Sequence, residues 1–431
     1  MRWTRTLLLS TLVFTLCDSG EAQTNTPPKL IAIRASHLLD VKAGSMISNV
    51  VVLIEDDRIR SVGPALTIPT STEVIDLGDA TLLPGLIDCH THLLARVPQG
   101  PNGYGLNLLT KSQAFRALEG AADARITLHA GFTSVRDVEN EGSGYADVAL
   151  RDAINQGLVE GPRMQVATRA IAAIGQYNPF GISPDLRDFP TGAQMISGPE
   201  EARRAAREQI GFGADLLKVY ADWLHPTLTI DEIRAVVEEA HKSHLKVAAH
   251  AESPEGIRNA LVAGVDSIEH GGSADRSSLD LMKQKNAFWV PTKGNFVFRL
   301  DTVTNPRQRK YMEDVLNNAR QNIALAQELG VRIANGFDAS SAEDQGHNAR
   351  EIVAMSKLGL PPMEALRAAT TAASELLGWQ DKVGSIEPGK YADIIAVPGD
   401  PLLDISQVEH VKFVMKGGVV IKNEMLLAAP H

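Results

Sequence analysis

The 431-residue sequence predicts an α/β fold, a (β/α)8 TIM barrel with a small composite β-sandwich domain formed by the N- and C-terminal segments. Helical and strand-like segments alternate between residue 86 and about residue 380, a pattern typical of a parallel sheet. Short β-like runs lie before and after this region, and neither end is large enough to bury a good core alone. We therefore expect residues 30–85 and 381–431 to form one β-domain, into which a barrel of residues 86–380 is inserted.

Residues 1–22 have the pattern of a secretory signal peptide. Two arginines precede an apolar stretch that is too short to cross a bilayer, and small residues precede a cleavage position after Ala22. The sequence thus predicts a secreted or periplasmic protein with a linker over residues 23–29. Lipoprotein anchoring through Cys17 is not expected, because the residues before it fit a lipoprotein cleavage site poorly. No other apolar run reaches the length of a transmembrane helix, so stable membrane insertion is not expected.

The composition is that of an ordinary globular protein, with 44% hydrophobic and 22% charged residues. The net charge of −10 and the absence of a basic stripe argue against a nucleic-acid partner. Cys89 is the one cysteine that remains after removal of residues 1–22, so the mature chain cannot form an intrachain disulfide. The number of subunits stays open, and a homo-oligomer is compatible with the sequence.

Eight strand-like segments follow one another in the middle of the chain, the number of a (β/α)8 barrel. They are residues 86–92, 132–137, 163–171, 216–220, 246–250, 264–270, 288–292 and 331–338. Helix signals separate them. The run Thr229-Ile-Asp-Glu is a capping box that begins a helix, and Gly330 ends a long helix that begins near Arg307.

Polar side chains capable of binding a metal stand at the ends of these strands. They are His90, His92, Lys218, His250, His270 and Asp338. Side chains alternate faces along a strand, so His90 and His92 reach the same side, and two converging imidazoles can hold a metal ion. A single histidine at such a place is more often structural. The joint occurrence of all six at the carboxyl ends of barrel strands, where such barrels carry their chemistry, favours a metal site.

These motifs resemble those of the amidohydrolase superfamily over essentially the whole mature chain. The matching stretches are LPGLIDCHTH (83–92), LLKVY (216–220), AAHAES (248–253), SIEHG (267–271), NGFDA (335–339) and GSIEPGKYADI (384–394). Within the superfamily the chain looks like the imidazolonepropionase-like branch, which contains Xaa-Pro dipeptidases of the prolidase type. One departure is Phe337, where many relatives have threonine; strand alternation should point it away from the site.

The resemblance implies a binuclear metal-dependent hydrolase, and the signal-peptide pattern predicts that it is secreted. His90, His92 and Asp338 would hold the more buried of two divalent ions, expected to be zinc, and His250 and His270 the other. Lys218 would bridge both ions after N6-carboxylation, because an ammonium cannot ligate a cation whereas a carbamate is a carboxylate on a long stem. A metal-bridged hydroxide would attack the amide bond of a dipeptide (Xaa-Pro or similar) or an N-acyl amino acid, including ochratoxin-like amides. Asp338 would act as the catalytic proton acceptor.

Further residues are candidates for substrate contacts. Tyr220 shares a strand face with Lys218, and His225 and His347 lie in loops that follow barrel strands. Arg136 and Asp137, after the second strand, are interpreted as a structural ion pair in preference to a carboxylate anchor. Residues 172–197 are a candidate active-site lid, and residues 295–306 are a second candidate.

Three other functions compete with amide hydrolysis. A one-metal deaminase would have glutamate three residues after the histidine of the fifth strand and would lack the lysine, but Ser253 and Lys218 stand at these positions. A lactone or phosphotriester hydrolase could use the same metal centre and stays open. A non-catalytic binding protein would be expected to have lost ligands, and none of the six is missing.

Overall fold

A computed structural model describes residues 28–98, 100, 102–176, 183, 185, 190–223 and 225–425. The expected signal peptide, Cys17 and most of the linker lie outside the described residues, as does part of the candidate lid at residues 172–197. Within the described ranges, no helix has both the length and the apolar character needed to cross a membrane.

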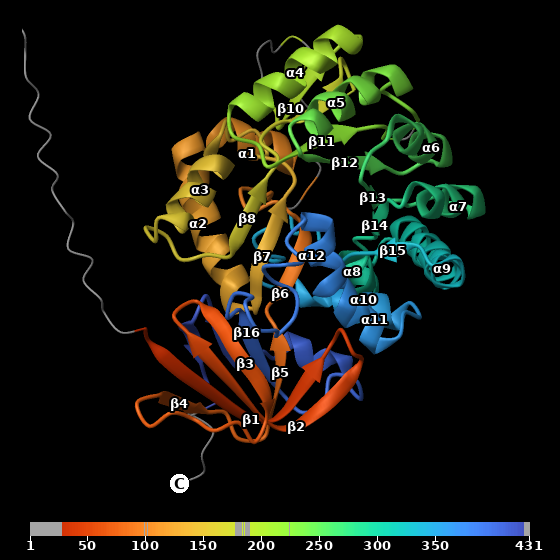
Figure 1. Ribbon diagram of the computed structural model, residues 1–431. Coiled ribbons are helices and arrows are strands. Elements are labelled where there is room, and N and C mark those ends of the chain that lie inside the picture. Colours follow the sequence, from red (N-terminus) through yellow and green to blue (C-terminus); the bar gives the residue numbers. More distant parts are fainter. Residues whose placement is uncertain are drawn as a thin grey trace, which may run out of the picture.

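Strands from both ends of the described chain form one eight-stranded sheet, in the order β18-β17-β16-β5-β1-β2-β3 with β4 paired to β1. They are β1 (Leu30–Asp40), β2 (Ser45–Glu55), β3 (Arg58–Pro64), β4 (Glu73–Asp76), β5 (Ala80–Pro84), β16 (Ile394–Pro398), β17 (Phe413–Lys416) and β18 (Val419–Asn423). The two ends meet where β5 pairs antiparallel with β16, with Leu83 opposite Ile395. Ile33 and Val52 from the first part share a buried core with Phe413 from the last. In Figure 1 this sheet lies below the barrel, with its red and blue strands side by side.

Parallel strands form the barrel. They are β6 (Leu86–Thr91), β7 (Phe132–Asp137), β8 (Arg163–Val166), β9 (Ala170–Ala173), β11 (Leu216–Tyr220), β12 (Lys246–Ala251), β13 (Ser267–His270), β14 (Phe288–Val290) and β15 (Arg332–Ile333). Backbone hydrogen bonds join the last strand region to the first: Cys89 N–H donates to Asn335 O (2.8 Å), and Asp338 N–H donates to His90 O (2.9 Å). On the other side of the ring, Asp215 N–H, before β11, donates to Val166 O of β8 (2.8 Å). The predicted TIM barrel with an added β-rich domain is confirmed.

The third predicted strand, residues 163–171, is divided into two. β8 pairs with β7, whereas β9 pairs with β11 and also with β10 (Ala193–Ile196). Between them Thr168 has a φ of 60°, in the left-handed region, and its N–H donates to the Asp147 carboxylate at 2.8 Å. The break follows from this backbone turn, which the apolar pattern of the segment did not indicate.

Helices surround the barrel (Figure 1). They are α1 (Gly103–Thr110), α2 (Gln113–His129), α3 (Ala146–Asn155), α4 (Pro199–Gly211), α5 (Ile230–Lys242), α6 (Pro254–Ala263), α7 (Arg276–Lys285), α8 (Gly294–Arg299), α9 (Pro306–Leu329), α10 (Ala349–Lys357), α11 (Pro362–Ala368) and α12 (Thr371–Leu377), with short 3-10 turns at Leu300–Thr302 and Ile405–Glu409. The predicted capping box is present, since Thr229 Oγ1 accepts from Glu232 N–H (3.2 Å) while the Glu232 carboxylate accepts from Thr229 N–H (2.8 Å).

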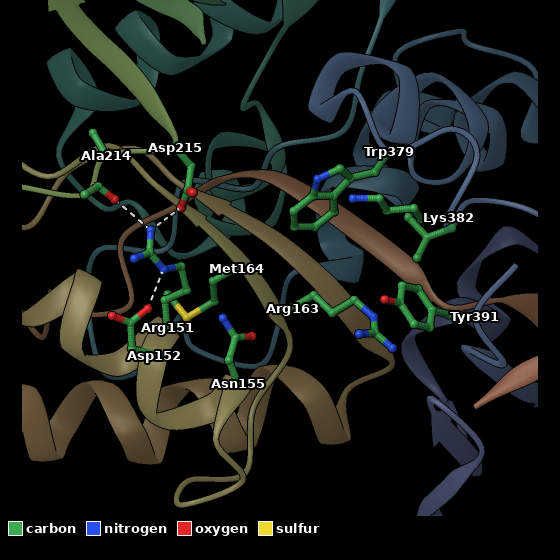
Figure 2. A pocket seen from close by; sticks show the side chains of 12 residues that line it. Arg151, Asp152, Asn155, Arg163, Met164, Ala214, Asp215, Trp379, Lys382 and Tyr391 are labelled. Carbon is green, nitrogen blue, oxygen red and sulfur yellow. Dashed lines mark hydrogen bonds and ion pairs between the residues drawn. The ribbon is translucent and has the colours of Figure 1, made fainter. Parts of the chain in front are cut away.

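A cavity of about 590 Å³ lies at the amino ends of the barrel strands, next to the β-domain (Figure 2). Its arginines have carboxylate partners: Arg163 donates to Asp393 (3.0 Å) and Arg151 donates to Asp215 (2.7 Å). The Arg163 guanidinium also lies 3.7 Å from the centre of the Tyr391 ring. This end of the barrel joins the two parts of the fold, and the predicted ligands lie at the other end of the strands.

Candidate metal centre

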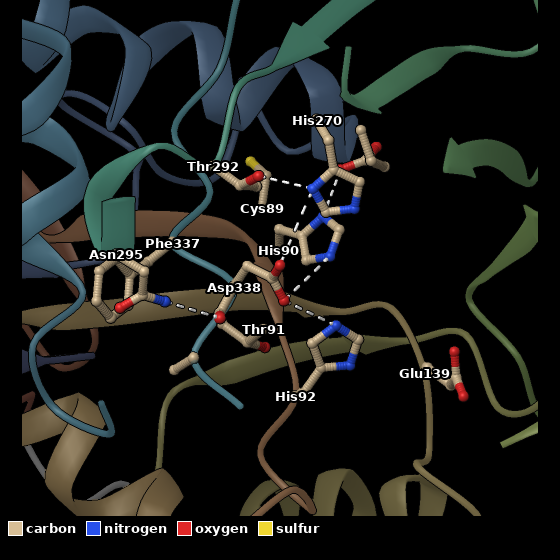
Figure 3. Close-up of polar contacts among 12 residues, drawn as sticks. Cys89, His90, Thr91, His92, Glu139, His270, Thr292, Asn295, Phe337 and Asp338 are labelled. Atoms are coloured by element: carbon tan, nitrogen blue, oxygen red, sulfur yellow. Dashed lines mark hydrogen bonds and ion pairs between the residues drawn. The ribbon is translucent and has the colours of Figure 1, made fainter. Parts of the chain in front are cut away.

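Two histidines and an aspartate converge at the carboxyl ends of the first and last barrel strands (Figure 3). His92 Nε2 lies 3.3 Å from Asp338 Oδ1, and His90 Nε2 lies 3.7 Å from the same oxygen. One ligand atom from each of the three residues lies within 4.8 Å of the others. Nitrogen and carboxylate ligands at this spacing suit a divalent metal such as zinc.

His250 and His270 extend this cluster toward the fifth and sixth barrel strands. Their ring centres lie 4.6 Å apart, and the ring centre of His270 lies 4.8 Å from that of His90. His250 Nε2 is buried and has no hydrogen-bond partner among the described residues. A buried nitrogen without a partner is costly unless something binds its lone pair, so this atom fits a metal ligand.

Lys218 lies inside the same cluster. Its side chain is 1% exposed, and none of the ion pairs among the described residues includes it. Burial lowers the pKa of Lys218. Its charge also contributes to the lowered pKa of His90 and of His250, which places it near both rings. A lower pKa favours the neutral amine of Lys218 over its ammonium form.

The Nδ1 atoms of three histidines are held by neighbouring side chains. His90 Nδ1 forms a hydrogen bond of 2.8 Å with Glu269 Oε2, and His92 Nδ1 lies 2.8 Å from Glu141 Oε1 in an ion-pair contact without hydrogen-bond geometry. His270 Nδ1 lies 2.7 Å from Thr292 Oγ1. Contacts of this kind fix the orientation of an imidazole and leave its Nε2 atom for a metal.

The electrostatic environment divides the histidines. Burial lowers the pKa of His90, His250 and His270 well below the usual value, which keeps them in the neutral form that binds metals. Burial alone would also lower the pKa of His92, but the Glu141 and Asp338 carboxylates outweigh it and hold this pKa well above the usual value. His92 is therefore the imidazole for which a metal ion must compete with a proton.

Strained backbone positions two of the predicted ligands. Asp338 has a φ of 62° and His270 a φ of 69°, in the left-handed region that residues other than glycine rarely adopt. Asp88 ties the first strand to the last by accepting the N–H groups of His90 (3.0 Å) and Phe337 (3.1 Å). The Phe337 ring lies next to Gly294 and, in Figure 3, on the side away from the histidines, as strand alternation predicts.

The candidate substrate contacts lie in different places. Tyr220 is buried at the carboxyl end of β11, where its O–H donates to Glu139 (2.5 Å) and its ring centre lies 5.0 Å from that of His250. His225 and His347 are both exposed. Among the described residues, neither has a hydrogen bond, ion pair or ring contact with the six predicted ligands, and the charges around His347 are those of Arg350, Glu409 and Asp344.

Arg136 and Asp137 have structural roles, but they are not partners, so the predicted pair between them is wrong. Neighbours in a strand point to opposite faces. Arg136 is 2% exposed and donates to Glu269 (2.7 Å), Cys89 O (2.6 Å) and Ser267 Oγ (3.0 Å). Asp137 accepts Leu93 N–H (2.7 Å) on the other face.

Sequence reasoning missed the residues that hold the histidines, namely Glu269, Glu141 and Thr292. Glu269 could have been found, since a carboxylate inside an otherwise apolar strand beside His270 needs a buried partner. Glu141 and Thr292 lie in connecting segments, where no periodic pattern indicates which way a side chain points.

Comparison with known proteins agrees with this geometry. The profile of the amidohydrolase family matches residues 81–421. An ochratoxinase from Aspergillus niger is 29% identical over 444 residues, covering 92% of this chain and 88% of that protein. An imidazolonepropionase from Deinococcus deserti is 24% identical over 392 residues, covering 84% of this chain and 88% of that protein. The crystal structure of a Xaa-Pro dipeptidase with bound methionine in the active site has a TM-score of 0.82 at 34% identity, covering 92% of this chain and 100% of that chain.

Proposed function

Because this chain belongs to the amidohydrolase family and is a hydrolase of amide bonds, we propose that its six convergent residues bind two divalent metal ions, expected to be zinc. His90, His92 and Asp338 would hold one ion, and His250 and His270 the other. Lys218, carboxylated on its terminal nitrogen, would bridge them. The observation that carries this proposal is the set of histidines oriented by Glu269, Glu141 and Thr292 around the buried, unpartnered Nε2 atom of His250.

The bound ions would supply a water of lowered pKa and polarise the scissile carbonyl. The chain's own groups move the proton and position the substrate. The Asp338 side chain contacts the histidines and is 33% exposed, so its carboxylate is also open to solvent, where it can accept a proton and pass it to the leaving amine. Tyr220, held by Glu139, lies beside His250 and would contribute to substrate positioning.

The relatives support a substrate class. The structural neighbour with bound methionine is a Xaa-Pro dipeptidase, and the Aspergillus relative is an ochratoxinase. We infer hydrolysis of a dipeptide, Xaa-Pro or similar, or of an N-acyl amino acid, including ochratoxin-like amides. The signal-peptide pattern at the N-terminus, outside the described residues, supports a secreted or periplasmic location.

The position that would distinguish a deaminase serves another purpose. Ser253 caps helix α6, where its Oγ accepts Gly256 N–H at 3.0 Å. The neighbouring Glu252 accepts Gly272 N–H at 2.8 Å. The residue three positions after His250 is therefore a helix cap without a carboxylate, and this supports hydrolysis over deamination.

The experiment is a hydrolysis screen of dipeptides and N-acyl amino acids with wild-type protein, Lys218→Ala and the control Lys357→Ala. Lys357 is exposed on α10 and remote from the predicted ligands in the sequence. The proposal predicts turnover by wild type and the control, and its loss in Lys218→Ala. Undiminished turnover in Lys218→Ala would rule out the bridging lysine, and the absence of amide hydrolysis with wild type would rule out the substrate class.

A further inference from the structure

A second buried lysine, Lys293, lies beside the predicted metal centre. It follows β14 and Thr292 and directly precedes helix α8. The residue is 4% exposed. Among the described residues its ammonium has one polar contact, the carbonyl oxygen of His270 at 3.4 Å, and it takes part in no ion pair. A hydrogen bond of this length is weak, so most of the donor capacity of the ammonium is unused.

The carboxylates whose pKa values respond to the charge of Lys293 accept hydrogen bonds from backbone N–H groups. Burial raises the pKa values of Glu252 and Glu351, and the charge of Lys293 partly opposes this rise, so both carboxylates lie within its field. Glu252 accepts Gly272 N–H (2.8 Å), and Glu351 accepts Gly294 N–H. Neither forms an ion pair with Lys293. A buried cation without an anionic partner is unfavourable, and an anion that binds beside it recovers that cost.

The position of Lys293 connects this charge to the site. The adjoining Thr292 holds His270 Nδ1 (2.7 Å), and Lys293 contacts the backbone oxygen of the same histidine. Two residues later, Asn295 Nδ2 donates to Asp338 O at 3.2 Å. The start of α8 therefore lies directly beside His270 and Asp338. Tyr220 and Trp223, stacked with ring centres 4.8 Å apart, lie beside His250 on another side.

We propose that Lys293 is a specificity-determining residue that binds the free carboxylate on the leaving-amine side of the substrate. This inference rests on the proposed amide hydrolysis and adds the group that recognises one end of the substrate. A carboxylate offers acceptors to the unused ammonium donors and neutralises the buried charge. An amide in the middle of a peptide has no such group, so Lys293 would restrict the enzyme to substrates that end in a carboxylate.

A merely structural lysine would behave differently. If Lys293 served packing alone, its replacement by methionine would affect all substrates equally, because methionine has a similar length and lacks only the charge. The critical test is thus a comparison of two substrates that differ in that carboxylate alone. N-acetyl-L-methionine and its carboxamide are such a pair.

The experiment measures kcat and KM for both compounds with metal-loaded wild type, Lys293→Met, Lys293→Arg and the control Lys357→Met. Lys357 is an exposed lysine at the end of α10, and its Nζ lies 4.6 Å from the ring centre of Phe298 in helix α8. Loss of a hydrogen bond to a charged group predicts that Lys293→Met raises KM for the acid by about tenfold to a hundredfold. The KM for the carboxamide should change less than about threefold. Lys293→Arg should retain part of the preference for the acid over the carboxamide, and the control should match wild type.

A binding measurement separates this proposal from the proposed function. Calorimetric titration should show that wild type binds L-methionine at least about tenfold more tightly than L-methioninamide, and that Lys293→Met loses this difference. If wild type hydrolyses neither compound, the proposed function is wrong and the titration alone decides the role of Lys293. Equal binding of the two ligands by wild type, or equal losses on acid and carboxamide in the variants, would overturn the assignment. If Lys293→Met does not fold, the wild-type titration and Lys293→Arg give the same decision.

Discussion

Replacement of Arg136 by methionine removes the positive charge behind the predicted metal centre. Arg136 and Glu269 are 2% and 0% exposed, and Glu269 in turn lies 2.8 Å from His90 Nδ1. The variant leaves a buried carboxylate without its cation. Breaking a buried pair in this way costs about 3–5 kcal/mol. Because Glu269 would then favour a proton and hold His90 less well, metal affinity should also fall by about tenfold to a hundredfold.

The assay combines guanidinium unfolding of the metal-loaded protein with metal competition against a chelator. The double variant Arg136→Met/Glu269→Gln removes both charges, so it should recover most of the lost stability. Arg163→Met is the matched control, since Arg163 pairs with Asp393 at the other end of the strands and should leave metal affinity unchanged. A loss of unfolding free energy below about 1 kcal/mol in Arg136→Met would refute this reasoning. So would a double variant whose loss equals the sum of the losses in Arg136→Met and Glu269→Gln.

Three further changes test other parts of the site. Asp338→Asn removes the proposed proton acceptor and should lower kcat by at least about a hundredfold, and a kcat within tenfold of wild type would contradict that role. Burial raises the pKa of Glu351 from 4.5 to about 7, so the free energy of unfolding of wild type should fall by about 3 kcal/mol relative to Glu351→Gln as the pH rises through this range. Parallel pH profiles in chemical unfolding would exclude that shift. In Gly336→Ala the new Cβ would meet Val290 Cγ1 at 2.4 Å and His90 Cβ at 2.7 Å, so we expect a loss of about 1–3 kcal/mol and weaker metal binding, measured by unfolding and chelator competition; a variant with wild-type values would show that the first strand can move freely.

The strand order and the six convergent residues could be predicted from the sequence because both depend on local pattern. Parallel strands bring their carboxyl ends to one edge, so His90 and Asp338, far apart in the chain, had to meet if the segments were strands. Phe337 points away from the histidines as predicted, although it lies beyond the end of β15. The division of the third strand was not predictable, because it depends on the positive φ of Thr168 and on the hydrogen bond that its N–H donates to Asp147.

Loop residues and buried partners could not be assigned from pattern. His225 and His347 follow barrel strands, yet the paths of their loops leave both exposed. Arg136 was placed correctly as structural, but its partner Glu269 is 133 residues away. In the sequence, Lys293 is a single lysine after a short strand, and no pattern there indicates a function. Its significance comes from three-dimensional burial without an ion pair among the described residues.

The measurement that tests the central claim most directly is the metal content of purified wild-type protein and of Lys218→Ala, determined by elemental analysis. The account predicts two equivalents of a zinc-like divalent metal per wild-type chain and at most one in the variant, together with loss of amide hydrolysis. One equivalent in both proteins, with activity indifferent to Lys218, would contradict a two-metal centre bridged by a carboxylated lysine.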